Sequence, residues 1–515
     1  MTNRSINLLR KLSDLLKDFV HADSEDLSNI MNEYSELSER EKVVFIDLIY
    51  DSLKDSKLQL LQLLTLFTCS DNNSYALKLI GKTALEADLS PEELLEFYIQ
   101  YRYVTFVANS CSRGELITIY KRLIKELKSL LSHSYNYVDY SKRNSNRILL
   151  VTNQILSELH APTLILVNQY YYLKKAGYKV DVLVVSERKI PVPDIWIGPA
   201  VCFDNITNQQ GPFTLNYQGQ TIEGTTLFLE TSDLKSSVTL ALDAIRDYNP
   251  AFVISIGEMN LIPDIASMFT TVVTKTTTKN IPFTLSRYVM YRDVFEYDGY
   301  ENYMDDDIVV LQNYFMNVLV PPEEGSEDII DNLHQEKRFK IVIVGNRLDN
   351  EISTDFVIAL NNLAERFPDL VFVVVGSCEG LETFVQKSGY IDHYYFTGCV
   401  RNLSGVTKEC DVFLNPPRDG GGFSAELALK HGLPVITLGN CDAAEWAGPE
   451  YICTSVASMI EDLKKCYSDL TYLNMRSEKA IERWKSKTLS ENDGIDNTKS
   501  FCAEVIEYIK KEKHL

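Results

Sequence analysis

Residues 415–438 read NPPRDGGGFSAELALKHGLPVITL. Three consecutive glycines, Gly420 to Gly422, separate an apolar strand-like run from the helical segment FSAELALKH. A Gly-Leu-Pro turn then leads into a second apolar run, VITL. Strand, glycine turn, helix and strand in this order are typical of a doubly wound α/β domain.

The glycine turn also predicts a binding site. Glycines between a strand and a helix let backbone N–H groups approach a phosphate, and the helix N-terminus adds a favourable charge. A hydroxyl in the first helical turn can donate, and a glutamate one turn further on can accept hydrogen bonds from a ribose diol. We therefore predict that Gly421, Gly422, Phe423, Ser424 and Glu426 bind a nucleotide. The alternative is a plain glycine turn followed by a solvated glutamate.

Outward from this stretch, apolar runs alternate with helical segments in two regions. The first region contains RILLVTN (147–153), KVDVLVVS (179–186), TTLFLE (225–230), AFVISIG (251–257) and TTVVTK (270–275); the second contains FKIVIVGN (339–346), LVFVVVG (370–376), HYYFTG (393–398), DVFLNP (411–416) and PVITLG (434–439). Each region predicts a Rossmann-like domain with a parallel sheet. The acidic, turn-rich stretch 320–336 between them is predicted to be a linker.

The N-terminal region has a helical sequence pattern and lacks the alternation of strands and helices. Its apolar residues recur at helical spacing, and Pro91 is the first proline. Ser38 to Glu41 and Ser90 to Glu93 both fit the Ser-x-x-Glu capping box. We predict an all-α domain at 1–140, a Rossmann-like acceptor domain at 141–325, and a Rossmann-like nucleotide-sugar domain with closing helices at 326–515.

Composition restricts the class of protein. The formal charge of −21 over 515 residues disfavours nucleic acid or an anionic membrane as the main partner. The ten cysteines form no Cys-x-x-Cys pair, and no apolar run reaches the ~20 residues that span a bilayer. These features predict a cytoplasmic protein without a membrane span. The sequence contains no metal-binding motif either, so we expect neither a metal nor a permanently bound cofactor.

The stretch that begins at Arg418 resembles the nucleotide-binding signature of GT-B glycosyltransferases. Glu426, followed by Ala428, Gly432 and Pro434-Val435, is similar to that superfamily's Glu-Ala-x-x-x-Gly-x-Pro-Val segment. The resemblance implies that the glycine turn holds a diphosphate and that Glu426 holds the ribose. Arg418 stands where retaining members with a Glu-x7-Glu pattern carry their first glutamate; arginine there resembles the inverting enzyme that adds N-acetylglucosamine in peptidoglycan synthesis. Retention or inversion therefore stays open.

The resemblance implies further site residues. Arg347, just past strand 339–346, resembles the superfamily's diphosphate-contacting arginine, and Val400 lies where such enzymes place the nucleobase. His160, in the first loop of the first α/β region, resembles the general base of inverting members, and Glu258 follows a strand in an equivalent position. The alternatives are a salt bridge for Arg347, a helix cap or acceptor binding for His160, and acceptor binding or a helix N-terminal role without chemistry for Glu258.

These features predict a metal-independent glycosyltransferase, either a hexosyltransferase or an N-acetylhexosaminyltransferase. It would use a nucleoside-diphosphate sugar, with a UDP-sugar as the expected donor, and a protein or glycan as acceptor. The helical domain is similar in plan to that of some protein-modifying N-glucosyltransferases, which implies an acceptor or protein-partner surface. Two alternatives are a sugar-nucleotide 2-epimerase and a non-catalytic GT-B partner of another glycosyltransferase.

Overall fold

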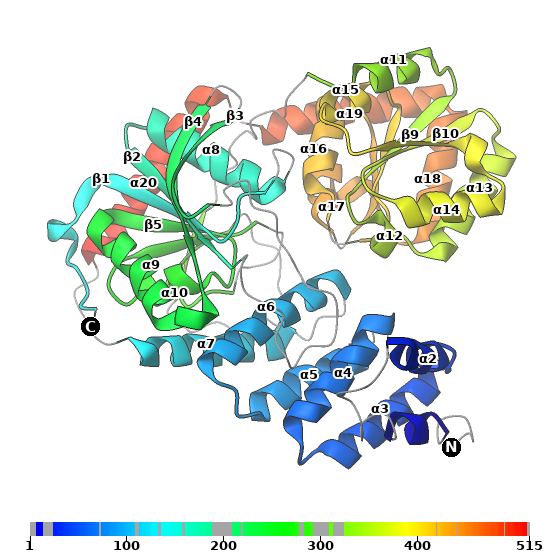
Figure 1. Cartoon of the computed structure of the whole chain (residues 1–515). Helices are drawn as coiled ribbons and strands as arrows, with labels where there is room; N and C mark the ends of the chain where they lie inside the picture. The colour runs from blue at the N-terminus through cyan, green and yellow to red at the C-terminus, as the bar shows by residue number, and fades with distance from the viewer. Residues whose placement is uncertain are drawn as a thin grey trace.

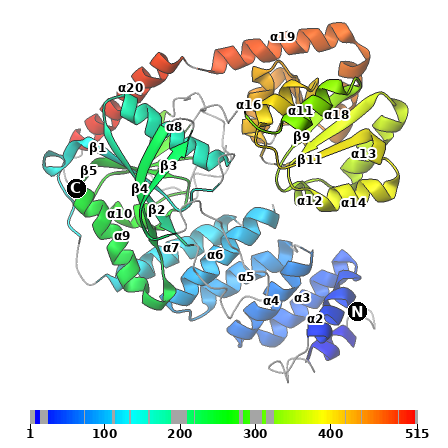
Figure 2. The ribbon, with the colours of Figure 1, turned by 45° about the horizontal axis from the view of Figure 1, so that its top comes forward.

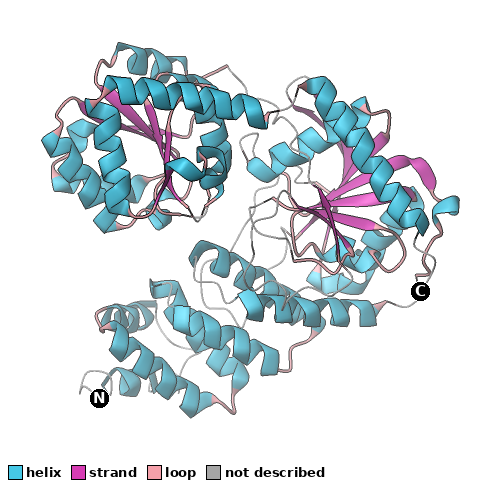
Figure 3. Ribbon diagram, turned by 180° about the vertical axis from the view of Figure 1, so that it is seen from behind, coloured by secondary structure: helices cyan, strands magenta, loops and turns pink. Residues whose placement is uncertain are grey.

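The computed structural model has a helical unit followed by two α/β units, each built on its own sheet (Figure 1). It describes residues 7–13, 24–71, 74–108, 113–131, 135–156, 160–187, 209–217, 220–277, 283–291, 308–312, 324–418, 420–439, 441–488 and 490–511. Both sheets lie between layers of helices, as the view from behind shows (Figure 3). The predicted fold class, two Rossmann-like domains after an all-α domain, is confirmed.

The described residues of the helical unit form helices joined by short turns and loops. Its labelled helices are α2 (Ser24–Ser35), α3 (Glu39–Leu53), α4 (Lys57–Asp71), α5 (Ser74–Glu86), α6 (Pro91–Ala108) and α7 (Arg113–Leu130). The Glu93 carboxylate accepts from the Ser90 backbone N–H at 2.8 Å, and the Ser90 hydroxyl accepts from the Glu93 N–H at 3.2 Å. A capping box thus begins α6, as predicted, and Ser38 and Glu41 form the other one at α3.

The first sheet has the strand order β3-β4-β2-β1-β5-β6-β7-β8. Its strands are β1 (Asn144–Thr152), β2 (Lys179–Ser186), β3 (Gly211–Tyr217), β4 (Gln220–Phe228), β5 (Pro250–Ile256), β6 (Val272–Lys275), β7 (Tyr288–Tyr291) and β8 (Val309–Gln312); its helices include α8 (Ala161–Lys175), α9 (Leu234–Tyr248) and α10 (Leu261–Ala266). All pairs are parallel except β3 with β4. The sequence patterns did not predict β3, β7 or β8; β3 is a half-exposed edge strand, and β8 forms the opposite edge of the sheet.

A single hydrophobic core joins the helical unit to one face of this sheet. Leu149 and Val151 of β1 belong to the same buried cluster as Tyr98 of α6 and Tyr120 of α7. Ile148 and Leu150, which alternate with them along β1, face the second cluster on the opposite side of the sheet. The helical unit is therefore packed onto the first α/β unit rather than tethered beside it.

The second sheet has the order β11-β10-β9-β12-β13-β14, and all its pairs are parallel. Its strands are β9 (Phe339–Val344), β10 (Leu370–Val375), β11 (Tyr394–Gly398), β12 (Val412–Leu414), β13 (Val435–Leu438) and β14 (Ile452–Cys453); its helices are α11 (Glu327–Gln335), α12 (Leu348–Glu351), α13 (Thr354–Arg366), α14 (Glu379–Ser388), α15 (Leu403–Lys408), α16 (Gly422–Lys430), α17 (Asp442–Ala447), α18 (Val456–Ser468) and α19 (Leu470–Lys487).

The linker prediction was wrong for the residues of α11. The acidic residues of α11 gather on its exposed side, while Leu333 is buried in the core of the second unit. An amphipathic helix thus lies where charge and turn residues suggested an irregular segment.

The last helix returns to the first α/β unit. After α19, helix α20 (Glu491–Lys511) lies along α8, as Figure 2 shows. Phe501, Cys502 and Val505 are buried in the cluster that also holds Ile148 and Leu150. The sequence patterns grouped this helix with the second α/β domain, but its core contacts belong to the first. None of the described helices is both long enough and apolar enough to cross a membrane.

Candidate functional site

The glycine turn lies between β12 and the nine-residue helix α16. Gly421 has a φ of +97°, and a Cβ there would lie 2.2 Å from the Asn415 Oδ1. A Cβ on Gly422 would lie 2.9 Å from the Cβ of Asp442. Both positions therefore require glycine. The turn presents bare backbone at the positive end of a helix, which is the arrangement that binds phosphates.

Arg418 fastens this turn to the neighbouring strand β9. Its side chain is only 6% exposed. The guanidinium donates to the Asn415 Oδ1 at 2.8 Å, to the Glu351 Oε2 at 2.9 Å and to the Val344 carbonyl at 2.6 Å. Asn415 is the residue that a side chain at Gly421 would strike. Arg418, the residue that departs from the Glu-x7-Glu pattern, thus holds Asn415 and the glycine turn against the end of β9.

Arg347 shares the Glu351 carboxylate with Arg418. Its Nη2 lies 2.8 Å from the Glu351 Oε1, and its side chain is 41% exposed. The salt bridge considered from the sequence is therefore present, and its partner is Glu351. Asp349 instead accepts from the backbone N–H groups of Gly380 and Leu381 at the start of α14. Glu351 therefore holds an exposed arginine beside the glycine turn.

Glycines at the ends of strands in the second sheet allow neighbouring loops to approach closely. The sequence patterns did not single out these glycines. Gly376 has a φ of +122°, and a Cβ there would lie 1.9 Å from the Gly345 carbonyl oxygen. The Gly376 N–H donates to the Gly398 carbonyl at 2.9 Å. A signal was present in the sequence, because the runs FKIVIVG, LVFVVVG and HYYFTG each end in glycine. Val400 follows β11 and is buried, with 4% of the residue exposed, and it belongs to a core cluster of the second unit.

The remaining predicted nucleotide-binding residues lie on the first turns of α16. Ser424 and Glu426 are partly exposed there. Phe423 is also partly buried, and it packs against the core cluster of the first α/β unit. That cluster includes Ile155, in the loop after β1. Phe423, in the first turn of α16, thus links the second unit to the core of the first.

His160 forms the N-cap of α8. Its Nδ1 lies 3.1 Å from the Thr163 hydroxyl, which also accepts from the Leu156 N–H at 3.1 Å. Burial lowers the pKa of His160 to about 4, because the charged imidazolium is poorly solvated there. The ring is therefore neutral near pH 7, and the same desolvation makes it a weaker base than an exposed imidazole. The cap and a catalytic role are compatible in this geometry.

Glu258 follows β5, which is the neighbour of β1 in the sheet. Its Oε2 accepts from the Phe283 N–H at 2.8 Å. The structure therefore places Glu258 and His160 after adjacent parallel strands, at the same edge of the sheet. Within the described residues, no group of three or more His, Cys, Asp or Glu side chains could hold a metal ion.

The arrangement of two Rossmann-like units, with a glycine turn at a helix N-terminus in the second, is that of a GT-B protein. Residues 327–469 match the family described as glycosyl transferases group 1. The solved structure of a mutant O-GlcNAc transferase from Thermobaculum terrenum resembles the chain with a TM-score of 0.52 at 12% identity; the match covers 99% of this chain and 98% of that one. This likeness shows the fold, including the helical domain. The resemblance to GT-B glycosyltransferases is confirmed.

Weaker likenesses cover only part of the chain. HepE from Anabaena in complex with UDP matches at 12% identity and a TM-score of 0.47, over 70% of this chain and all of that one. The pneumococcal O-GlcNAc transferase GtfA in complex with UDP and GlcNAc matches at 9% identity and a TM-score of 0.47, over 72% of this chain and all of that one. No curated protein sequence matches.

Proposed function

We propose that this protein is a metal-independent glycosyltransferase that moves a sugar from a UDP-sugar to a protein or glycan acceptor. The observation that carries the proposal is the glycine turn at Gly421 and Gly422, held by Arg418 and flanked by Arg347. Such a site neutralises a diphosphate with backbone N–H groups and one guanidinium. The developing charge on a leaving nucleoside diphosphate needs the same donors.

Each predicted nucleotide-binding residue has a role in this proposal. Arg347 and the N–H groups near Gly421 and Gly422 hold the diphosphate. Ser424 donates to it from the first turn of α16, and Glu426 accepts from the ribose. The backbone at Val400 lies against the base, and Phe423 keeps the turn against the acceptor-side unit.

Acceptor activation belongs to the first α/β unit in this proposal. His160 or Glu258 takes the proton from the attacking group as the bond to the sugar forms. The low pKa of His160 keeps it unprotonated over the physiological range. The helical domain recognises a protein acceptor or a partner subunit, and the protein works in the cytoplasm.

Calorimetry with UDP, GDP and their sugar conjugates tests the donor site. We expect micromolar binding of one nucleotide. Glu426→Ala should weaken it about 10- to 100-fold, because a hydrogen bond to a charged group contributes about 1.5–3 kcal/mol. Glu478→Ala, at an exposed glutamate on α19, is the matched control and should bind like the wild type. If none of these nucleotides binds, the proposal is wrong.

Turnover separates the enzyme from its alternatives. With the bound donor, a glycosyltransferase should transfer the sugar to a suitable acceptor or slowly hydrolyse the donor. A 2-epimerase would instead change the stereochemistry of the free sugar nucleotide. Tight binding without transfer, hydrolysis or epimerisation would favour a non-catalytic partner subunit.

A further inference from the structure

The loop that carries Glu258 has an unusual backbone. Gly257 has a φ of +97°, and Met259 has a φ of +48° although it is not a glycine. A left-handed conformation is unfavourable for a methionine, so the surrounding structure must hold it there. The loop therefore depends on its neighbours for its shape.

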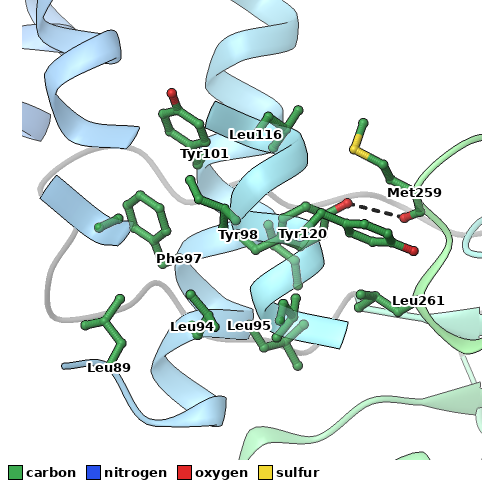
Figure 4. Packing of buried hydrophobic residues seen from close by; sticks show 14 of the residues in the cluster. Leu89, Leu94, Leu95, Phe97, Tyr98, Tyr101, Leu116, Tyr120, Met259 and Leu261 are labelled. Atoms are coloured by element: carbon green, nitrogen blue, oxygen red, sulfur yellow. Dashed lines mark hydrogen bonds between the residues drawn. The ribbon is translucent and has the colours of Figure 1, made fainter. Parts of the chain in front are cut away.

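Those neighbours include the helical domain. The Tyr98 hydroxyl of α6 donates to the Met259 carbonyl at 3.3 Å, as Figure 4 shows. On the other side, the Met259 N–H donates to the Phe283 carbonyl at 2.9 Å. The Phe283 N–H in turn donates to the Glu258 Oε2 at 2.8 Å. A continuous chain of three hydrogen bonds thus runs from Tyr98 to the Glu258 carboxylate.

Tyr98 is itself held rigidly. Its side chain is fully buried, and its ring centroid lies 5.5 Å from that of Tyr120 on α7. The Tyr120 hydroxyl donates to the Asp264 Oδ2 at 2.6 Å, and the Tyr120 ring meets Phe283 edge-on with centroids 6.0 Å apart. The two helices therefore contact both the Glu258 loop and the segment that positions its carboxylate.

Charged side chains also connect the helical domain to the loop that carries Glu258. Arg102 lies one turn after Tyr98 on α6, and its guanidinium interacts electrostatically with Glu258 and Glu187. Burial raises the pKa of Glu187, and Arg102 opposes that rise. A cation of the helical domain thus lies among carboxylates that follow β5 and β2.

We propose that Tyr98 is a positioning residue, through which the helical domain sets the Glu258 carboxylate for acceptor activation. The proposal rests on the function proposed above. In this proposal the helical domain positions a residue that activates the acceptor, in addition to recognising the acceptor or a partner subunit. Loss of the hydroxyl would leave the fold in place but release the Met259 carbonyl and, through Phe283, the carboxylate.

Tyr98→Phe in the full-length protein tests this, with Tyr101→Phe as a matched control. Tyr101 is equally buried on the same helix, but its hydroxyl donates to the Leu77 carbonyl at 3.1 Å, inside the helical domain. Both variants should lose similar thermal stability. Only Tyr98→Phe should lower kcat, by about tenfold, while UDP affinity stays within about twofold. Equal kcat values for the two variants, with Glu258→Gln strongly impaired, would overturn the proposal.

Hydrogen exchange gives a readout that does not need turnover. In Tyr98→Phe the amides of Met259 and Phe283 should exchange about tenfold faster than in the wild type, whereas Tyr101→Phe should leave them unchanged. Unchanged exchange in Tyr98→Phe would overturn the positioning role. If the wild type transfers no sugar but exchange does change, the proposed function fails while the structural coupling stands.

Discussion

The two α/β units differ in how the loops that follow their strands are held in place. In the second unit, the loops after the strands pack closely at Gly345, Gly376 and Gly421, where a side chain would clash. The buried guanidinium of Arg418 donates to the Val344 carbonyl at the end of β9. In the first unit, the loop after β5 is held from outside by Tyr98 of another domain. The hydrogen bonds of Arg418 stay within the second unit, whereas the loop after β5 also receives a hydrogen bond from the helical domain.

This difference predicts that nucleotide affinity and acceptor activation depend on different parts of the molecule. The hydrogen bonds by which Arg418 holds the glycine turn all lie within the second unit, so we expect the geometry of the nucleotide-binding turn to change little when the helical domain is perturbed. An edge held by a second domain can respond to what that domain binds. Perturbations of the second unit should therefore affect stability and nucleotide affinity, whereas perturbations of the helical contact should affect turnover.

The largest effect is expected at Arg418. Arg418→Met removes three hydrogen bonds and leaves Glu351 without one of its two cations. Breaking a buried ion pair costs about 3–5 kcal/mol, so the free energy of unfolding should fall by roughly that amount. Urea denaturation measures it.

Arg347→Met is the matched comparison, since Arg347 pairs with the same carboxylate but is 41% exposed. Its free energy of unfolding should change by about 1 kcal/mol or less, and its UDP affinity should fall at least tenfold. If Arg347→Met proved as destabilising as Arg418→Met, or bound UDP normally, the division between a structural and a ligand-binding arginine would be wrong.

The sequence predicted the parts of the fold whose signal is local. KVDVLVVS coincides with β2, and LVFVVVG with β10 plus its glycine, because buried parallel strands are continuous apolar runs. Helix α11 was missed because only one side of it is apolar, and its acidic residues resemble a linker. The position of α20 was missed because an amphipathic helix does not specify which of two cores it will cover.

The site was predictable to the same extent. The glycine turn and Arg347 were apparent from their places after strands, and the structure brings them together through Glu351. The network beneath them was not, since Arg418 contacts residues 67 and 74 positions away in the sequence. The hydrogen bond from Tyr98 spans 161 positions and has no local signature. The nucleotide-binding roles of the glycine turn, Glu426, Arg347 and Val400 stay predictions, as do the catalytic roles of His160 and Glu258.

The next effect concerns His160 and pH. Its pKa is about 4 in the folded protein and near 6.5 in an unfolded chain, so the unfolded state binds the proton first as pH falls. Stability contributed by the neutral ring is complete above about pH 6.5 and is lost as pH falls towards 4. The full loss amounts to about 3 kcal/mol at ~1.4 kcal/mol per pKa unit.

His160→Asn keeps a residue suited to the N-cap of α8 but removes the titrating group. Thermal unfolding of the two proteins between pH 4 and 7 should therefore show a steeper decline for the wild type. Parallel curves would mean that burial does not lower the pKa of His160, and this prediction would be wrong.

The last comparison separates two neighbouring glycines of the turn, and its expected loss of stability is smaller than those at Arg418 and His160. Gly421→Ala places a side chain at a φ of +97° and against the Asn415 amide that Arg418 holds, so it should cost about 2 kcal/mol and weaken UDP binding more than tenfold. A Cβ on Gly420 would meet nothing within 4 Å, so Gly420→Ala should keep nearly wild-type stability and affinity. Calorimetry and urea denaturation of the pair compare them directly. If the two variants behaved alike, the turn would tolerate side chains, and close approach of its backbone to a diphosphate could not explain nucleotide binding.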